Sequence, residues 1–225
     1  MAIRATMTKE EVNELSSLAS FDGQIEVIEK EEEIEPAIAF LSQHKEVGFD
    51  TETKPSFSRG ESNEVALLQI STLEKAFLFR VCITGITEPL KKFIEDDSTM
   101  KIGLSLQDDF RAMRRRTHGL EPAMFVDLQK ICPAYGIEEQ SLRSIYAILF
   151  EEKMSKQARL TNWEAAILPE KAIQYAALDA YSCLRIYYQL LTLPTPDPYK
   201  FGLEVKSKFH KKLTNIVPLR RKSTT

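Results

Sequence analysis

Two acidic residues separated by one position follow a short apolar run. Asp50 and Glu52 come directly after Val47-Gly48-Phe49, a composition that predicts a buried strand. Because alternate residues of a strand point to the same face, the two carboxylates project together, roughly 7 Å apart along the backbone. Burying like charges is costly without a nearby cation, and no Lys or Arg closely precedes Lys54. A metal ion would satisfy the pair; the alternative is a strand that simply ends in a polar loop.

A further acid occurs in the first turn of a predicted helix. Ser105 and Asp108 have the spacing of a capping box, so we expect Asp108 to serve the helix end. Asp109 shares an i, i+4 stripe with Met113 and is expected to face inward or into a cleft. The alternative for Asp109 is a first-turn acid that only stabilises the helix dipole.

The last acidic position lies in an alanine-rich helix. Tyr175 and Asp179 are four residues apart, which stacks them on one helix face, and the neighbouring alanines allow another layer to approach closely. A local contact between the two at the helix surface is the alternative. Carboxylates converging from a strand and two helices are the ligands that Mg²⁺ or Mn²⁺ prefers, and several around two ions suit phosphoryl chemistry.

The elements that must position these residues alternate as in a single α/β domain. Short connections between the first strands predict an antiparallel meander, and later β and α units predict added parallel strands covered by helices. We expect a mixed sheet of about five strands, with a mainly helical remainder up to Leu193. Strands are predicted at 24–28, 47–53, 65–70, 75–81, 101–104 and 124–127, and helices at 36–44, 88–95 and 106–118.

Length and charge indicate one core with a basic end. We expect a polar extension over residues 1–20, a domain over 21–193 and a Pro-rich linker with a basic tail over 194–225. The net charge is −3, but the chain from Tyr199 onward carries eight Lys or Arg against one acid, Glu204. An acidic body that binds divalent cations would expose less negative charge to a polyanion, and the basic tail could bind nucleic acid or only solubilise the chain.

Cysteine spacing and hydropathy indicate the compartment. Cys82, Cys132 and Cys183 form no C-x-x-C pair and are expected to be reduced core residues. No apolar run approaches eighteen residues, and the N-terminus has no apolar signal segment. We therefore expect a soluble, cytoplasmic protein without a membrane partner.

The acidic motifs resemble those of the DEDD superfamily of 3′-to-5′ exonucleases, in the DEDDy branch represented by ribonuclease D and the Werner syndrome exonuclease domain. The resemblance covers roughly residues 21–193, and no His stands five residues before the last acid, which disfavours the histidine branch. The matching motifs are Gly48-Phe49-Asp50-Thr51-Glu52 followed by 65–70, Lys101-Ile102-Gly103 with Asp109, and Tyr175-Ala176-Ala177-Leu178-Asp179-Ala180-Tyr181.

This resemblance implies a ribonuclease-H-like fold and a metal-dependent 3′-5′ exonuclease that releases nucleoside 5′-monophosphates from single-stranded DNA or RNA ends. Two divalent cations, Mg²⁺ or Mn²⁺, are expected, with Tyr175 orienting the attacking water because a phenol with a pKa near 10 is a poor base. Ribonuclease D carries further C-terminal helical domains, so we expect a stand-alone or truncated nuclease domain here. The implied catalytic residues are Asp50, Glu52, Asp109, Tyr175 and Asp179, of which the four acids would bind the metals.

Basic residues before Trp163 are the predicted phosphate contacts: Lys153, Lys156 and Arg159, with a solvated loop as the alternative. Trp163 itself is expected to be a packing residue, and Arg114 to Arg116 a solvated helix end that complements the helix dipole. Two other functions remain open: a noncatalytic nucleic-acid or protein-binding module on the same fold, and an endonuclease with a ribonuclease-H-like site.

Overall fold

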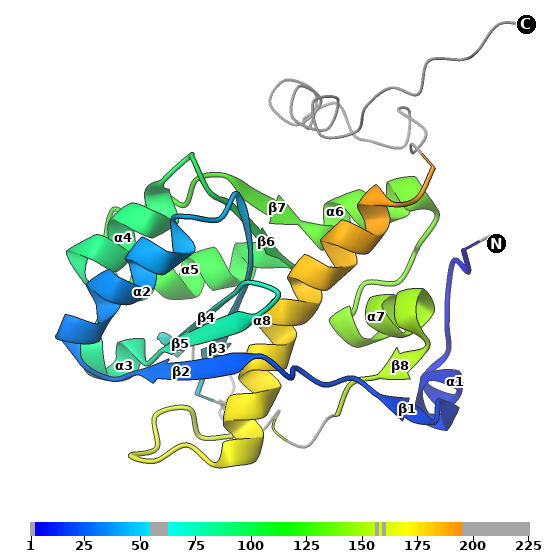
Figure 1. Cartoon of the computed structure of the whole chain (residues 1–225), viewed down its shortest axis with the longest axis horizontal. Coiled ribbons are helices and arrows are strands. Elements are labelled where there is room, and N and C mark those ends of the chain that lie inside the picture. The colour runs from blue at the N-terminus through cyan, green and yellow to red at the C-terminus, as the bar shows by residue number, and fades with distance from the viewer. Residues whose placement is uncertain (1–2, 55–62, 156–157, 159–160, 195–225) are drawn as a thin grey trace, which may run out of the picture.

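A six-stranded mixed sheet forms the centre of the protein (Figure 1) in a computed structural model that describes residues 3–54, 63–155, 158 and 161–194. The strand order is β2-β5-β4-β3-β6-β7. The antiparallel pairs β3·β4 and β4·β5 confirm the predicted meander, and β6 and β7 add in parallel. The edge strand β2, parallel to β5, makes the sheet one strand larger than expected. The strands are β2 (Gln24–Ile28), β3 (Glu46–Thr53), β4 (Val65–Ser71), β5 (Lys75–Phe79), β6 (Met100–Gly103) and β7 (Phe125–Asp127).

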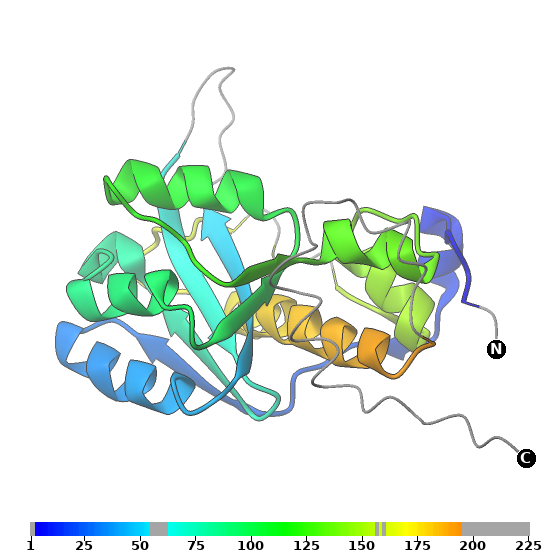
Figure 2. The ribbon, with the colours of Figure 1, turned by 90° about the horizontal axis from the view of Figure 1, so that it is seen from above.

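Helices cover both faces of this sheet (Figures 1 and 2). The long helix α8 (Glu170–Leu191) lies on one face, and α2 (Ile34–Leu41), α4 (Glu88–Glu95) and α5 (Leu106–Arg116) lie on the other. Every residue of β4 is buried, and from Leu67 onward its side chains alternate between the two cores: Leu67 packs on the α8 side and Leu68 on the opposite side. This alternation follows from the two-residue period of a strand.

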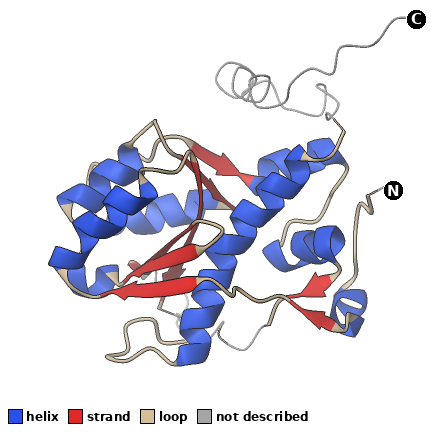
Figure 3. Cartoon of the chain, viewed as in Figure 1, coloured by secondary structure: helices blue, strands red, loops and turns tan. Residues whose placement is uncertain are grey.

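A smaller group of elements packs beside α8 (Figure 3). Helix α7 (Leu142–Phe150) contacts α8, and β1 (Ser17–Leu18) pairs in parallel with β8 (Glu152–Lys153). The N-terminal segment is more structured than a polar extension. Helix α1 (Lys9–Glu14) has a Thr8 capping box, and Met7 and Val12 pack on Ala147 of α7. The remaining short elements are η1 (Glu31–Glu33), α3 (Val81–Thr84), α6 (Leu128–Ile131) and η2 (Cys132–Tyr135).

Arg114 and Arg115 at the C-terminal end of α5 are exposed, as the sequence analysis expected, but the arginines of this turn also make tertiary hydrogen bonds. The Arg114 and Arg116 Nε groups donate hydrogen bonds to the carbonyls of Leu120 and Val65, at 3.0 and 2.7 Å. Arg115 donates to the Asn63 carbonyl at 2.9 Å. The Arg115 and Arg116 bonds tie the end of α5 to the beginning of β4, a tertiary role that the helix-dipole argument does not reveal.

A fully buried lysine lies on β6. The Lys101 ammonium donates to the carbonyls of Asp96 and Thr99, at 2.6 and 3.1 Å. Burial lowers the pKa of Lys101 to about 8, because the apolar surroundings disfavour the charged form. The two carbonyls satisfy the amine without removing the cost of burying its charge.

The three cysteines are unpaired, as the sequence analysis expected. Cys132 and Cys183 are buried, Cys82 is half-buried, and all three are free thiols. Within the described ranges no helix combines the length and apolarity needed to cross a membrane.

Candidate active site

Strand β3 presents Asp50 and Glu52 to the face covered by α8. The two layers meet at Gly48, where a Cβ atom would lie only 1.9 Å from the Ala180 carbonyl oxygen. Only a glycine permits this approach of strand to helix backbone. Since Asp50 and Glu52 share the face of Gly48, and Asp179 directly precedes Ala180, the contact brings acids from both elements together.

Helix α8 contributes Asp179 and Tyr175. Asp179 is 5 % exposed, and the Tyr175 hydroxyl donates a hydrogen bond to its carboxylate, as their spacing of four residues predicts. The Tyr175 ring lies beside the fully buried Trp163, with ring centroids 6.4 Å apart. Trp163 is therefore a packing residue, as expected, and it supports the ring of Tyr175.

Asp109 reaches the site at the free edge of β3. The pairing of β3 with β6 covers Glu46 to Gly48, and α5 begins shortly after β6 ends. The Thr51 hydroxyl donates a hydrogen bond to the Asp109 carboxylate. The neighbouring Asp108 is exposed and forms an ion pair with Arg111 at 2.7 Å. Of the two consecutive aspartates, Asp109 is thus the one that faces β3.

The predicted capping box at the start of α5 is wrong. Ser105 has a left-handed backbone, φ 61°, and its side chain makes no capping bond. The Asp127 carboxylate, at the end of β7, instead accepts hydrogen bonds from the backbone N–H groups of Ser105 and Leu106, at 2.9 and 3.2 Å. Asp127 thereby holds the start of the helix that carries Asp109. Sequence analysis missed it because residues 22 positions apart give no local signal.

The carboxylates influence one another electrostatically. The pKa of Asp50 is raised well above its usual value by burial and by the charges of Asp179, Asp109 and Glu52. Burial also raises the pKa of Asp109, against the Thr51 hydrogen bond, and that of Asp179, against the Tyr175 hydrogen bond and the positive charge of Arg143. The site thus gathers several carboxyl groups in surroundings that disfavour their charged form.

The donor set fits a divalent cation. Carboxylate oxygens are hard ligands. Burial raises the pKa of Asp50, Asp109 and Asp179, and the charges of neighbouring acids raise that of Asp50 further, so a bound cation would offset the cost of ionising these groups. Among the described residues no three His, Cys, Asp or Glu side chains are arranged as a group that could hold a metal ion without some adjustment. Two of the four acids are engaged with hydroxyl groups, Asp109 with Thr51 and Asp179 with Tyr175.

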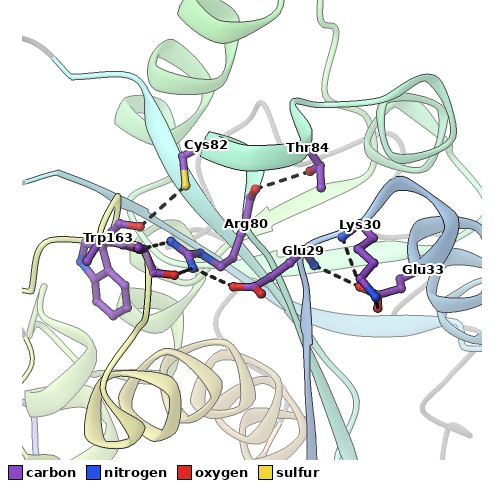
Figure 4. Close-up of polar contacts among 9 residues, drawn as sticks. Glu29, Lys30, Glu33, Arg80, Cys82, Thr84 and Trp163 are labelled. Carbon is purple, nitrogen blue, oxygen red and sulfur yellow. Dashed lines mark hydrogen bonds and ion pairs between the residues drawn. The ribbon is translucent and has the colours of Figure 1, made fainter.

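A buried arginine organises the loop that leads into α8 (Figure 4). Arg80, 1 % exposed, donates to the carbonyls of Ala165 and Ala166 and to the Glu29 carboxylate, the last at 2.7 Å. The Cys82 thiol donates to the Trp163 carbonyl at 3.8 Å. Arg80 therefore joins the end of β5 to the loop that carries Trp163. Its one sequence signal is a charge inside an apolar run, Phe77-Leu78-Phe79-Arg80-Val81.

The structure describes only part of the predicted phosphate-binding set. The Lys153 ammonium donates to the Asn13 carbonyl at 2.9 Å, and Lys156 and Arg159 lie outside the described residues. Arg143 on α7 is a cation that the sequence analysis did not consider. Its Nε group donates to the Met154 carbonyl at 2.9 Å, and its charge partly offsets the burial that raises the pKa of Asp179.

Comparison with known proteins identifies the family. A 3′-5′ exonuclease family model matches residues 25–193. Exonuclease 3′-5′ domain-containing protein 2 of Drosophila melanogaster is 33 % identical over 150 residues, covering 65 % of this chain and 25 % of the relative. A 3′-5′ exonuclease of Arabidopsis thaliana is 31 % identical over 156 residues, covering 66 % of this chain and 53 % of the relative. This chain thus spans between a quarter and about half of these two relatives.

Solved structures show the same fold at low identity. The Aedes aegypti Nibbler EXO domain superposes with a TM-score of 0.69 at 20 % identity, covering 89 % of this chain and 98 % of that one. Escherichia coli RNase D superposes with a TM-score of 0.65 at 22 % identity, covering 75 % and 44 %. These neighbours confirm the expected ribonuclease-H-like α/β fold with a mixed sheet flanked by helices. The chain belongs to the DEDDy 3′-5′ exonuclease family, whose motifs its sequence resembles.

Proposed function

We propose that the protein is a metal-dependent 3′-5′ exonuclease that hydrolyses phosphodiester bonds of single-stranded nucleic acid and releases nucleoside 5′-monophosphates. The observation that carries this proposal is the meeting of acids around Asp50, whose pKa is raised by burial and by the charges of Asp179, Asp109 and Glu52. Family membership supports nuclease activity on nucleic acid. Trypanosoma brucei RNase D has been solved with RNA, and Brucella melitensis NrnC with pGG, which supports a nucleic-acid ligand.

The four acids are the metal ligands in this proposal. Asp50, Glu52, Asp109 and Asp179 would together hold two Mg²⁺ or Mn²⁺ ions. When bound, the ions would acidify the attacking water and stabilise charge on the leaving 3′ oxygen. The hydrogen bond from Thr51 keeps Asp109 beside β3, so the acid is already near its partners.

Tyr175 orients rather than deprotonates the attacking water. Its pKa is raised above the ordinary value by burial and by the charges of Asp179 and Glu52, so the hydroxyl stays protonated at neutral pH. The same hydroxyl already donates a hydrogen bond to Asp179. A protonated phenol fixed at the edge of the acidic site can direct the lone pairs of a water molecule toward phosphorus.

The test is degradation of 3′-labelled and 5′-labelled single-stranded DNA and RNA with Mg²⁺ or Mn²⁺. Wild type should give a ladder that shortens from the 3′ end, and Asp50→Asn should abolish it. Asp108→Asn is the matched control, because Asp108 is exposed and pairs with Arg111, and it should retain full activity. Analysis of the released products for 5′-monophosphates tests whether the bond between phosphorus and the 3′ oxygen is the one that is cleaved.

Three other results would contradict the proposal. Cleavage of substrates blocked at the 3′ end would indicate an endonuclease. Binding without cleavage by folded wild type with metal would indicate the noncatalytic module. Activity that survives Asp50→Asn but not Asp108→Asn would refute the assignment of the acids.

A further inference from the structure

Gln69 is a polar residue in the middle of the buried strand β4. Its side chain is fully buried, and in the part of the chain that the structure describes neither amide atom has a hydrogen-bond partner. Buried polar groups without partners are costly and rare in native proteins. The neighbours Leu68 and Ile70 show that apolar side chains fit this strand. Packing alone therefore does not explain why position 69 is a glutamine.

The register of the sheet places Gln69 directly opposite Asp50 of β3. Residues opposite one another in antiparallel strands have Cβ atoms about 4.5–5.5 Å apart and point to the same face. That face is the one covered by α8, where Asp179 lies. On its other side, β5 presents the apolar Leu78 opposite Gln69. Asp50 is thus the polar cross-strand neighbour of the amide.

An amide suits this position chemically. Its NH₂ group has two donors, and its length allows it to reach a carboxylate on the adjacent strand or a water molecule bound to one. Donation to an ionised carboxylate is a charge-assisted hydrogen bond, stronger than one between neutral groups. Such a bond would fix the side-chain angle of Asp50 without adding charge to an already acidic site.

We propose that Gln69 is a positioning residue for Asp50. When Asp50 holds a divalent cation, the Gln69 amide donates an N–H hydrogen bond to its carboxylate, directly or through one ordered water. This inference rests on the cation site of the proposed function, but it does not depend on the nuclease substrate. Groups that orient metal ligands typically change metal affinity or activity by about 10–100-fold when removed.

The test compares Gln69→Met with Tyr187→Phe. Methionine keeps the length of glutamine and removes only the amide. Tyr187, on α8, has a buried hydroxyl that is likewise without a partner among the described residues, so Tyr187→Phe matches the loss of an unpaired polar group away from the acids. Without metal, the Tm of both variants should equal that of wild type or exceed it by up to about 2 °C, since each removes a buried unpaired group.

Metal-dependent measurements then separate the two variants. In a thermal titration with Mg²⁺ or Mn²⁺ alone, Gln69→Met should need about tenfold more metal than wild type for the same rise in Tm. In a separate nuclease assay its kcat should fall about tenfold with KM unchanged. Tyr187→Phe should match wild type in both. Gln69→Leu serves as a second apolar variant in case methionine packs poorly.

Several outcomes would overturn the inference. Wild-type metal dependence and kcat in both Gln69 variants would show that the amide does not act on Asp50. A large fall in the metal-free Tm of both would make Gln69 a packing residue only. If metal caused no Tm shift in wild type, the protein would bind no cation at this site and the inference about Gln69 would fail. A metal-dependent shift without nuclease activity would instead refute the proposed function and leave the metal titration as the deciding test.

Discussion

Replacing Gly48 with alanine should separate the strand and helix that bring the acids together. The new Cβ would lie 1.9 Å from the Ala180 carbonyl oxygen and 2.8 Å from its carbonyl carbon, whereas real Cβ contacts are essentially never under 3.0 Å. Both atoms belong to the helix backbone, so no side chain can rotate away. Helix α8 must therefore retreat from β3 by about 1 Å, directly beside Asp179.

This displacement sets the expected magnitudes. Overpacking a core costs about 1–3 kcal/mol and occasionally more, and a clash with backbone belongs at the upper end, so the free energy of unfolding should fall by about 3 kcal/mol. A misplacement of about 1 Å at a catalytic site can cost about 10²-fold in rate. We therefore expect kcat/KM of the folded variant to fall about 100-fold.

Urea unfolding followed by fluorescence gives the stability, because Trp163 is the one tryptophan of the chain and is fully buried. The matched control is Gly119→Ala, where a Cβ meets nothing within 4 Å but φ is +74°. It should cost only about 1 kcal/mol, from backbone strain, and leave kcat/KM unchanged. Equal stability and activity in the two variants would refute the view that the Gly48 approach sets the distance between the layers.

Three further perturbations test other parts of the structure. Tyr175→Phe should lower kcat about 10–100-fold with unchanged KM and Tm, because it removes only the hydroxyl bonded to Asp179; an equal loss in substrate affinity would contradict its role in orienting water. Arg80→Met should lower the free energy of urea unfolding by about 3 kcal/mol, since it leaves two loop carbonyls unpaired, whereas Glu29→Gln should cost under about 1 kcal/mol because Glu29 is half exposed. The pKa of Lys101 lies near 8 in the folded protein and near 10.5 in the unfolded chain. Between these two pH values the unfolded chain binds more protons, so the free energy of unfolding should rise with pH, by at most about 3 kcal/mol. Lys101→Met should lose this slope between pH 8 and 10, and a persisting slope would assign it to another group.

The sequence alone determined the parts of the site that depend on local periodicity. The two-residue period of a strand places Asp50 and Glu52 on one face, and the four-residue spacing of Tyr175 and Asp179 makes a contact within one helix. The apolar pattern also predicted the meander and the added parallel strands. These features follow from backbone geometry over a few residues, so they can be predicted from the sequence without the tertiary structure.

Only the tertiary structure decided which distant groups share an environment. Thr51 and Asp109 are 58 residues apart, and the capping of α5 by Asp127 replaced the local capping box that the sequence predicted. The opposition of Gln69 and Asp50 depends on the strand register, and the role of Arg80 depends on a loop 85 residues away. Such contacts arise because burial forces polar groups to find partners wherever the packed layers place them, and sequence spacing does not encode that distance.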